Sequence, residues 1–239
     1  NILPKGYPES DRYQITGIYR SARTVGGDYY DFIDLGPDRL GIVIGDVSGK
    51  SLPGMLVMLL TRDLVIKHAR RSAGPADLLS AVNRDLLPEV RKGTFVTMFY
   101  GILDTATGHL TFASAGHNPL IHHVSSTREQ RLIKTKGYPL GMMSAEQFSR
   151  RIEPAQIVLA ENDWCILYTD GINEAMDLGH KEYGMDRFLS TLNRSVDLPP
   201  VDLTRAVIDD IESFVGESPQ ADDITLLSLK WSRRPAESP

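Results

Sequence analysis

The chain has 239 residues, of which 41% are hydrophobic and 24% are charged, a composition typical of a globular protein with a sizeable core. The formal net charge is -5 and the basic residues are scattered, which argues against nucleic acid as the main partner because such a surface is basic. A single cysteine, Cys165, excludes an internal disulfide framework and a cysteine-rich zinc site, and fits a reduced cytoplasm.

Most of the predicted elements are strands joined in hairpins, and the predicted helices form two clustered pairs. In chain order they are strands over 12–20, 29–35 and 39–47, helices over 53–71 and 75–90, strands over 94–104, 109–115, 120–124, 131–135, 148–154 and 164–170, helices over 184–194 and 200–215, and a strand over 222–231. Ser51 is expected to cap the first helix, and 125–131 is expected to be a polar, mobile loop. The pattern predicts an α+β fold of antiparallel sheets packed with helices rather than βαβ winding.

We predict one domain over 1–231 and a disordered tail over 232–239, because neither a repeat nor a linker divides the chain. The first residue is Asn1 rather than Met, so we expect a further segment upstream. The most apolar stretch, LPGMLVMLL, is soon followed by Arg62 and Asp63 and predicts no membrane span.

Residues 41–51, GIVIGDVSGKS, look like a phosphate-binding P-loop, but the spacing is wrong. The G-x-x-x-x-G-K-[ST] pattern would need a glycine where Ile44 stands. Asp46 would also repel the phosphate that such a loop binds through its N–H groups. A nucleotide site is therefore disfavoured, and the role of Asp46 needs another explanation.

The predicted hairpin over 29–47 places two acids opposite each other. If its turn is centred near Pro37, the numbers of paired residues sum to about 74, and Asp28 faces Asp46. Their repulsion is roughly 3 kcal/mol at about 5 Å and an effective dielectric near 20. A cation between the two carboxylates would relieve it.

Two further acids are expected at one end of a second strand pair. Asp170 ends the strand WCILYTD and Asp222 begins the strand DDITLLSLKW, so antiparallel pairing brings both to one end. Oxygen donors without histidine or thiolate suit Mg²⁺ or Mn²⁺ rather than zinc. A plain turn role is common for one strand-end aspartate, but four such residues together favour a metal site.

Seven motifs occur in the order seen in the metal-dependent, type 2C-like serine/threonine protein phosphatases: VGGDYYDF, GIVIGDVSGK, TFVTMFYGILD, ASAGHNP, YPLGM, LYTDGINEA and ADDITLL. Over roughly residues 10–230 the chain resembles the bacterial branch typified by the sporulation stage II E and sigma-B regulator phosphatases. The resemblance implies a four-layer α-β-β-α sandwich, in which helix pairs flank two antiparallel sheets and two Mn²⁺ or Mg²⁺ ions lie between the sheet edges.

The resemblance also implies a set of metal ligands: Asp28, Asp46, the carbonyl of Val47, Asp170, Asp222 and Asp223. Asp46 resembles the carboxylate that bridges the two ions, and Asp28 the acid near the second ion. Asp223 stands where related enzymes often carry Asn, so which of Asp222 and Asp223 binds metal stays open. Arg23 matches the arginine that holds phosphate, with Arg20 as a competitor. Ser48 replaces the histidine that serves eukaryotic relatives as leaving-group acid, and metal-bound water is the expected substitute.

The implied activity is hydrolysis of phosphoserine or phosphothreonine on a partner protein by a hydroxide that the two ions activate, without a phosphoenzyme. A cysteine phosphatase, with its C-x₅-R pattern, would need an arginine where Gly171 stands.

The implied partner is a phosphorylated anti-sigma-factor antagonist of the STAS class in a cytoplasmic stress or developmental pathway. We hypothesise that an upstream sensor domain, an activator protein or homodimerisation moves the helix that begins near Pro53 and sets occupancy of the second ion. The alternatives are a decayed phosphoprotein-binding module and a metallohydrolase of small phosphoesters.

Overall fold

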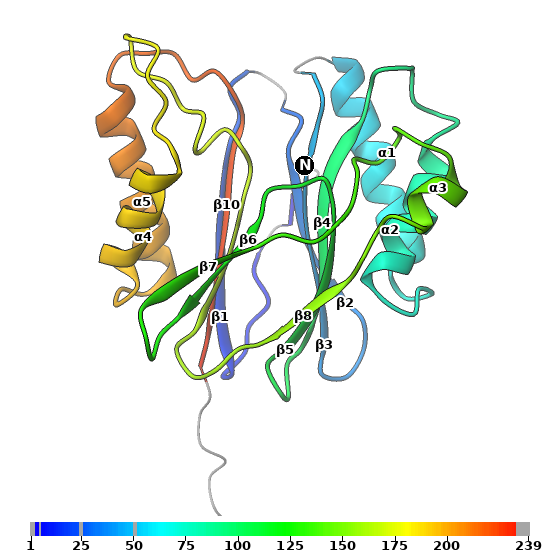
Figure 1. The fold of residues 1–239 in the computed structure, drawn as a ribbon. Helices are drawn as coiled ribbons and strands as arrows, with labels where there is room; N and C mark the ends of the chain where they lie inside the picture. The colour runs from blue at the N-terminus through cyan, green and yellow to red at the C-terminus, as the bar shows by residue number, and fades with distance from the viewer. Residues whose placement is uncertain (1–2, 5, 24–25, 50–51, 233–239) are drawn as a thin grey trace, which may run out of the picture.

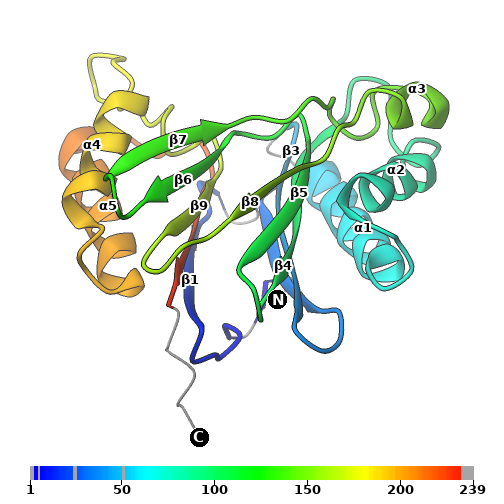
Figure 2. The same cartoon turned by 60° about the horizontal axis from the view of Figure 1, so that its bottom comes forward.

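The computed structural model describes residues 3–4, 6–23, 26–49 and 52–232. The described chain is a sandwich of two five-stranded sheets with helices on both outer faces (Figure 1, Figure 2). The helices are α1 (Leu52–Ala69), α2 (Pro75–Leu86), α3 (Ala145–Ser149), α4 (Met185–Ser195) and α5 (Pro200–Val215). The pair α4 and α5 covers one sheet, and α1 and α2 cover the other. This order confirms the predicted α-β-β-α sandwich.

Each sheet joins segments that are distant in the sequence. Sheet 1 has the order β1 (Tyr13–Arg20), β10 (Ile224–Trp231), β9 (Trp164–Tyr168), β6 (Leu120–Val124) and β7 (Glu129–Ile133). Sheet 2 has the order β2 (Tyr29–Asp34), β3 (Arg39–Val47), β4 (Val96–Asp104), β5 (His109–Ala115) and β8 (Ala155–Val158). Every pair of neighbouring strands is antiparallel, as the hairpin pattern predicts.

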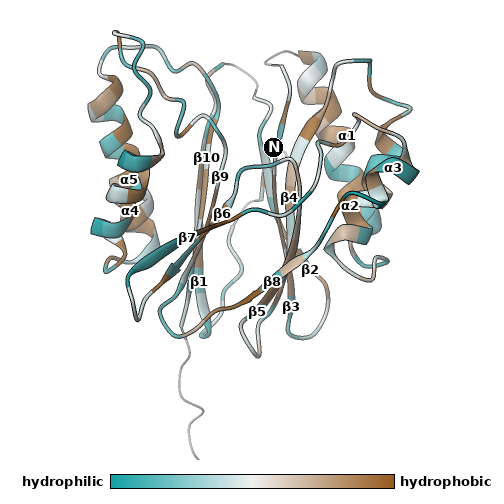
Figure 3. Cartoon of the chain, viewed as in Figure 1, coloured by the Kyte–Doolittle hydropathy of each residue, from teal (hydrophilic) through white to brown (hydrophobic). Residues whose placement is uncertain are grey.

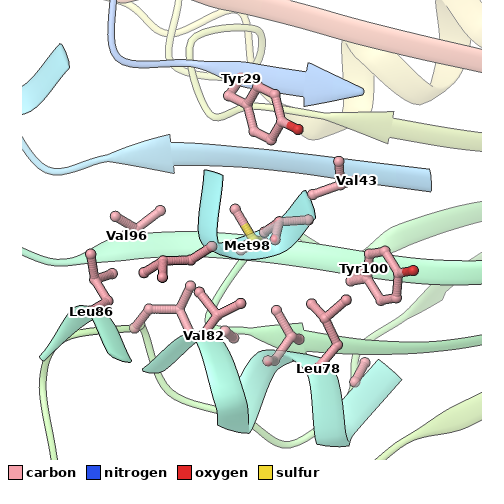
Figure 4. Close-up of a cluster of buried hydrophobic side chains, with 14 of the residues drawn as sticks. Tyr29, Val43, Leu78, Val82, Leu86, Val96, Met98 and Tyr100 are labelled. Carbon is pink, nitrogen blue, oxygen red and sulfur yellow. The ribbon is translucent and has the colours of Figure 1, made fainter. Parts of the chain in front are cut away.

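The core is divided between the layers. Leu78, Val82 and Leu86 on one face of α2 are buried and point toward Val96 and Met98 of β4 (Figure 4). A second cluster fills the space between the sheets, and a third lies between sheet 1 and the α4–α5 pair. Because apolar side chains lie on both faces of the central strands, the hydrophobic colour runs along them, whereas the edge strand β7 is mainly hydrophilic (Figure 3).

Two predicted segments are wrong. The strand predicted over 148–154 is absent: Ser144 accepts from the backbone N–H of Gln147 and begins α3, which buries Phe148, and β8 starts only at Ala155. The loop predicted over 125–131 ends early, because Glu129 already pairs with Val124 in the β6–β7 hairpin. A polar strand at the edge of a sheet resembles a loop in sequence, since it has a neighbour on one side only.

Other boundaries differ by a few residues. Helix α2 ends at Leu86, four residues before the predicted end, and the nearby Pro88 has no N–H to continue the helix. The predicted cap Ser51 and the tail beyond Ser232 lie outside the described residues. None of the described helices is long and apolar enough to cross a bilayer.

Candidate metal centre

The β2–β3 hairpin has the register that the sequence predicts. Tyr29 pairs with Gly45 and Tyr30 with Ile44, so Asp28 lies across from Asp46 one step beyond the paired strands. Asp28 is only 2% exposed, and burial is the main cause that raises its pKa well above the usual range. The negative charge of Asp46 is the second cause. The two carboxylates therefore repel each other in a poorly solvated place.

Strands β9 and β10 bring two further acids to the same region. The pairing of Tyr168 with Leu226 places Asp170 and Asp222 at a common end of sheet 1. Gly171 permits this approach, because a Cβ there would collide with the carbonyl oxygen of Asp223. The predicted convergence of these strand ends is thus present.

Acids from both sheets meet around Asp46. Burial is the largest cause that raises the pKa of Asp46 to about 7. The charges of Asp170, Asp222 and Asp223 act in the same direction, and a hydrogen bond with Asp28 opposes them. In the described ranges, no three His, Cys, Asp or Glu side chains are already arranged to hold a metal ion. The carboxylates thus share one electrostatic environment without forming a closed ligand set.

Two threonines that the sequence analysis missed hold Asp28 in place. Thr169 donates to Asp28 Oδ2 over 2.8 Å, and Thr225 donates to the same atom over 2.6 Å. Thr169 also accepts from the backbone N–H of Thr225, so the two residues form one buried unit. The signal in the sequence was a threonine directly before Asp170, in YTD, and another two residues after Asp223, in DDIT.

Asp222 and Asp223 have different surroundings. Asp223 is buried, and its two oxygens accept from the backbone N–H groups of Ala22 (2.8 Å) and Gly27 (2.6 Å). Asp222 is half-buried, and its Oδ1 accepts from the N–H of Asp223 over 2.8 Å. Asp223 therefore fixes Ala22 and Gly27, near the two ends of the segment that joins β1 to Asp28.

The remaining predicted site residues lie around this group. Val47 is buried at the end of β3, and a Cβ on Gly27 would stand 3.4 Å from its carbonyl oxygen. Arg23 is exposed, and its carbonyl accepts from the Ser21 hydroxyl over 2.6 Å. The competitor Arg20 forms an ion pair with Glu212 of α5.

Ser48, which replaces the histidine of eukaryotic relatives, is engaged with the backbone. Its Oγ accepts from the N–H of Phe95 over 2.9 Å, and its own N–H donates to the Phe95 carbonyl over 2.9 Å. Ser48 therefore fastens the segment before β4 to the end of β3. The nearby Lys50 lies outside the described residues.

The donor set fits a hard divalent cation. The group offers carboxylate oxygens, with a backbone carbonyl beside them, and the buried repulsion between its acids is what a bound cation would relieve. A side chain at Gly27 would come within 2.7 Å of Val47 Cγ1 and 3.6 Å of Asp46 Oδ1, so glycine keeps this space open. Mg²⁺ and Mn²⁺ both accept such donors.

Comparison with known proteins agrees with this geometry. The family model described as Stage II sporulation protein E (SpoIIE) matches residues 36–232, from just before β3 to just after β10. The chain is 28% identical to Protein IcfG of Synechocystis sp. over 259 residues, 96% of this chain and 39% of that protein. It is 28% identical to phosphoserine phosphatase RsbU of Bacillus subtilis over 176 residues, 72% of this chain and 50% of that protein. The chain thus spans half or less of the length of these relatives.

Solved structures share the fold. The structure of the RsbU and RsbW domains of a Mycobacterium tuberculosis protein has a TM-score of 0.78 and 25% identity, covering 94% of this chain and 61% of that chain. RsbX in complex with magnesium has a TM-score of 0.69 and 16% identity, covering 94% and 98%. The catalytic domain of the phosphatase PstP with two manganese ions has a TM-score of 0.66 and 12% identity, covering 93% and 99%. At the two lower identities the likeness concerns the fold alone.

Proposed function

Because the chain belongs to the stage II sporulation protein E family, we propose that it is a metal-dependent phosphatase of phosphoserine or phosphothreonine on a partner protein. The observation that carries this proposal is the electrostatic environment of Asp46, whose pKa rises to about 7 among acids from both sheets. Buried like charges need a compensating cation, and the oxygen donors suit Mn²⁺ or Mg²⁺.

We assign the ligands from the surroundings of each acid. Asp46, the Val47 carbonyl, Asp170 and Asp222 would hold one ion, and Asp46 together with Asp28 would hold the second. Asp222 is preferred over Asp223 because backbone N–H groups already occupy both oxygens of Asp223. When bound, such ions supply an activated water and neutralise charge on the phosphoryl oxygens.

Protein groups around the ions would fix positions rather than react. The Thr169 and Thr225 hydroxyls orient Asp28, and they support its charged form once a cation is present. Asp223 secures the segment that carries Arg23, which we propose binds the phosphoryl group in bidentate fashion. Ser48 is not assigned as leaving-group acid, because an alcohol hydroxyl is a very weak acid near neutral pH, and this one serves the backbone by accepting from Phe95.

We propose that the substrate is a phosphorylated anti-sigma-factor antagonist of the STAS class in the cytoplasm. Support comes from the relative RsbU, named a phosphoserine phosphatase, and from the similar structure in which an RsbU domain and an RsbW domain occur in one protein. Both similarities cover most of this chain. They make a protein substrate the first choice over a small phosphoester.

Control of the site is proposed to act through α1, by an upstream sensor domain, an activator protein or homodimerisation. Helix α1 packs closely against the end of β3 and the residues just after it: a Cβ on Gly54 would stand 3.4 Å from Val47 Cγ1 and would collide with the Gly49 carbonyl. The same helix exposes Leu52 and Leu56, which are 59% and 56% accessible. A partner on that face would therefore press on the segment next to Asp46.

The test is release of phosphate from a phosphoserine protein and from p-nitrophenyl phosphate, with Mn²⁺ and with a chelator. We expect Mn²⁺-dependent release that falls at least about 100-fold in Asp46→Asn. Asp34→Asn is the matched control, because Asp34 is an exposed acid at the far end of β2. Release that survives both chelation and Asp46→Asn would refute the proposal. Activity on the small ester alone would favour a phosphoester metallohydrolase, and metal-dependent binding without release a phosphoprotein-binding module.

A further inference from the structure

A polar cavity lies at the end of sheet 1 that is remote from the carboxylates. It has a volume of about 250 Å³ and lies between the ends of β6, β9 and β10 and the end of α4. Its lining residues are His123, Ser125, Arg128, Asn162, Trp164, Val196, Asp197 and Lys230. From Trp164 to Asp170 the chain advances six residues, which places this cavity about 20 Å from the candidate metal centre.

The cavity contains a cation, Lys230, that pairs with no acid in the part of the chain that the structure describes. Lys230 forms no ion pair with any residue that the structure describes, and its Nζ lies 5.2 Å from the centre of the Trp164 ring. Arg128, by contrast, donates to Asp197 over 3.1 Å and to the Asn193 carbonyl near the end of α4 over 3.3 Å. Asp197 is thus engaged, and among the described residues the Lys230 ammonium has the Trp164 ring beside it but no acid.

A buried histidine adds an unused polar atom. His123 is 2% exposed, and its Nδ1 has no hydrogen-bond partner among the described residues. The neighbouring acid Asp163 already has its own donors, because it accepts from His122 over 3.0 Å and from the N–H of Ser125 over 2.8 Å. A buried polar atom without a partner is costly, so a ligand that reaches this ring nitrogen would relieve that cost.

From these groups we propose that the cavity binds a tetrahedral oxyanion, as inorganic phosphate or as the head group of a phosphomonoester. The Lys230 ammonium supplies the charge, and the Asn162 amide, the Ser125 hydroxyl and the His123 ring supply further donors around it. Arg128 covers the negative end of α4 through the Asn193 carbonyl, so the helix terminus does not repel the anion. The site uses residues that have no part in the proposed phosphatase centre.

The experiment is calorimetric titration of the 239-residue chain, in a chelator, with phosphate, phenyl phosphate and acetate. Without metal the carboxylates repel anions, and the readout needs no turnover. The loss of affinity in Lys230→Gln separates binding in this cavity from binding at Arg23 of the proposed centre. We expect saturable binding of phosphate or phenyl phosphate, weakened at least about tenfold in Lys230→Gln. Lys134→Gln is the matched control, because Lys134 is exposed and lies outside the cavity. Tighter binding of phenyl phosphate would identify a phosphomonoester as the occupant, and tighter binding of phosphate the free ion.

A second variant keeps the test decisive if Lys230→Gln fails to fold. Asn162 has a φ of 65°, which glycine adopts without strain, so Asn162→Gly removes the amide and keeps the backbone. We expect it to weaken phosphate binding about fivefold. The proposal is overturned if phosphate shows no saturable binding, if acetate binds as well as phosphate, or if binding is unchanged in Lys230→Gln and Asn162→Gly.

Discussion

Thr225 on β10 of sheet 1 donates a 2.6 Å hydrogen bond to Asp28, which precedes β2 of sheet 2. Thr169 donates to the same carboxylate oxygen over 2.8 Å. Both threonines are fully buried, so their hydroxyls take the place of water around this carboxylate. One sheet therefore fixes the position of an acid that the other sheet supplies.

Removal of the Thr225 hydroxyl should weaken metal binding. We expect Thr225→Val to lower the free energy of unfolding by about 1–3 kcal/mol, because a buried carboxyl loses a donor. The Mn²⁺ concentration for half-maximal phosphate release should rise about tenfold. Thr204→Val is the matched control, since the buried Thr204 donates to Ser228 and forms no hydrogen bond with an acid of the described residues. An equal Mn²⁺ requirement in the two variants would contradict a positioning role for Thr225.

The adjacent acids Asp222 and Asp223 should respond in opposite ways. Asp222→Asn relieves repulsion on Asp46, so we expect a higher melting temperature in a chelator and less stabilisation by Mn²⁺. Asp223→Asn loses one of two oxygens that accept backbone N–H groups, and we expect a lower melting temperature with and without Mn²⁺. In the unmodified chain, Mn²⁺ at 100 times its Kd should add about 2.7 kcal/mol. Melting curves recorded in a chelator and with Mn²⁺ test this prediction. If Asp223→Asn had the higher melting temperature in a chelator and Asp222→Asn the lower one, the roles assigned to these acids would be exchanged.

Gly171 should tolerate no side chain. A Cβ there would collide with the Asp223 carbonyl and come within 3.3 Å of Asp222 Cβ, so the chain must shift at the acids. We expect Gly171→Ala to cost at least about 2 kcal/mol in the free energy of unfolding and to abolish phosphate release. Gly6→Ala is the control, because Gly6 is exposed, lies outside the helices and has nothing within 4 Å of its added carbon, and it should change stability by less than about 0.5 kcal/mol. Full activity in Gly171→Ala would contradict this prediction, because it would show that the chain around Gly171 can shift without disturbing the acids.

A pH-dependent prediction concerns the α4–α5 pair. Arg187 donates to Asp210 over 2.9 and 3.0 Å and Tyr183 over 2.6 Å, and the Arg187 hydrogen bond is the main cause that holds the pKa of Asp210 well below its usual range. A lowered pKa in the folded state contributes stability above the unfolded pKa near ~4, and this contribution disappears as the pH falls through the folded pKa. We expect Asp210→Asn to cost about 1–3 kcal/mol at neutral pH and progressively less below about pH 4.

Urea unfolding at several pH values measures this difference. Asp209→Asn is the matched control, because the neighbouring Asp209 is exposed on the same helix. A stability difference between Asp210→Asn and the unmodified chain that stays constant from neutral pH to pH 3 would contradict the assigned origin of the effect.

The sequence predicts the part of this centre that depends on strand order and register. The turn at Gly36-Pro37-Asp38 fixes the pairing of Tyr29 with Gly45, and that pairing places Asp28 opposite Asp46. The apolar strands that end at Asp170 and start after Asp222 can pair in few ways once the fold is a sandwich of antiparallel sheets. Alternation and turn chemistry are local properties, so they can be read from one chain.

The contacts between the sheets could not be predicted in the same way. The bond from Thr225 to Asp28 joins residues 197 positions apart, and no local pattern indicates which hydroxyl faces which acid. The role of Asp223 depends likewise on the path of the segment between β1 and β2. The error over 148–154 has a different origin, because a five-residue helix with one buried Phe148 lacks the periodicity that separates helix from strand.

The supply of carboxylates by both sheets has a mechanical consequence. Asp46 belongs to sheet 2 and Asp170 follows a strand of sheet 1, so the distance between the two acids depends on the relative position of the two sheets. Phe99 and Phe112, both of sheet 2, stack with ring centres 5.2 Å apart in the apolar layer between the sheets, and that layer sets this spacing. A force that slides one sheet over the other by more than about half an ångström, the precision that a functional site needs, would change the spacing of the acids without displacing a loop.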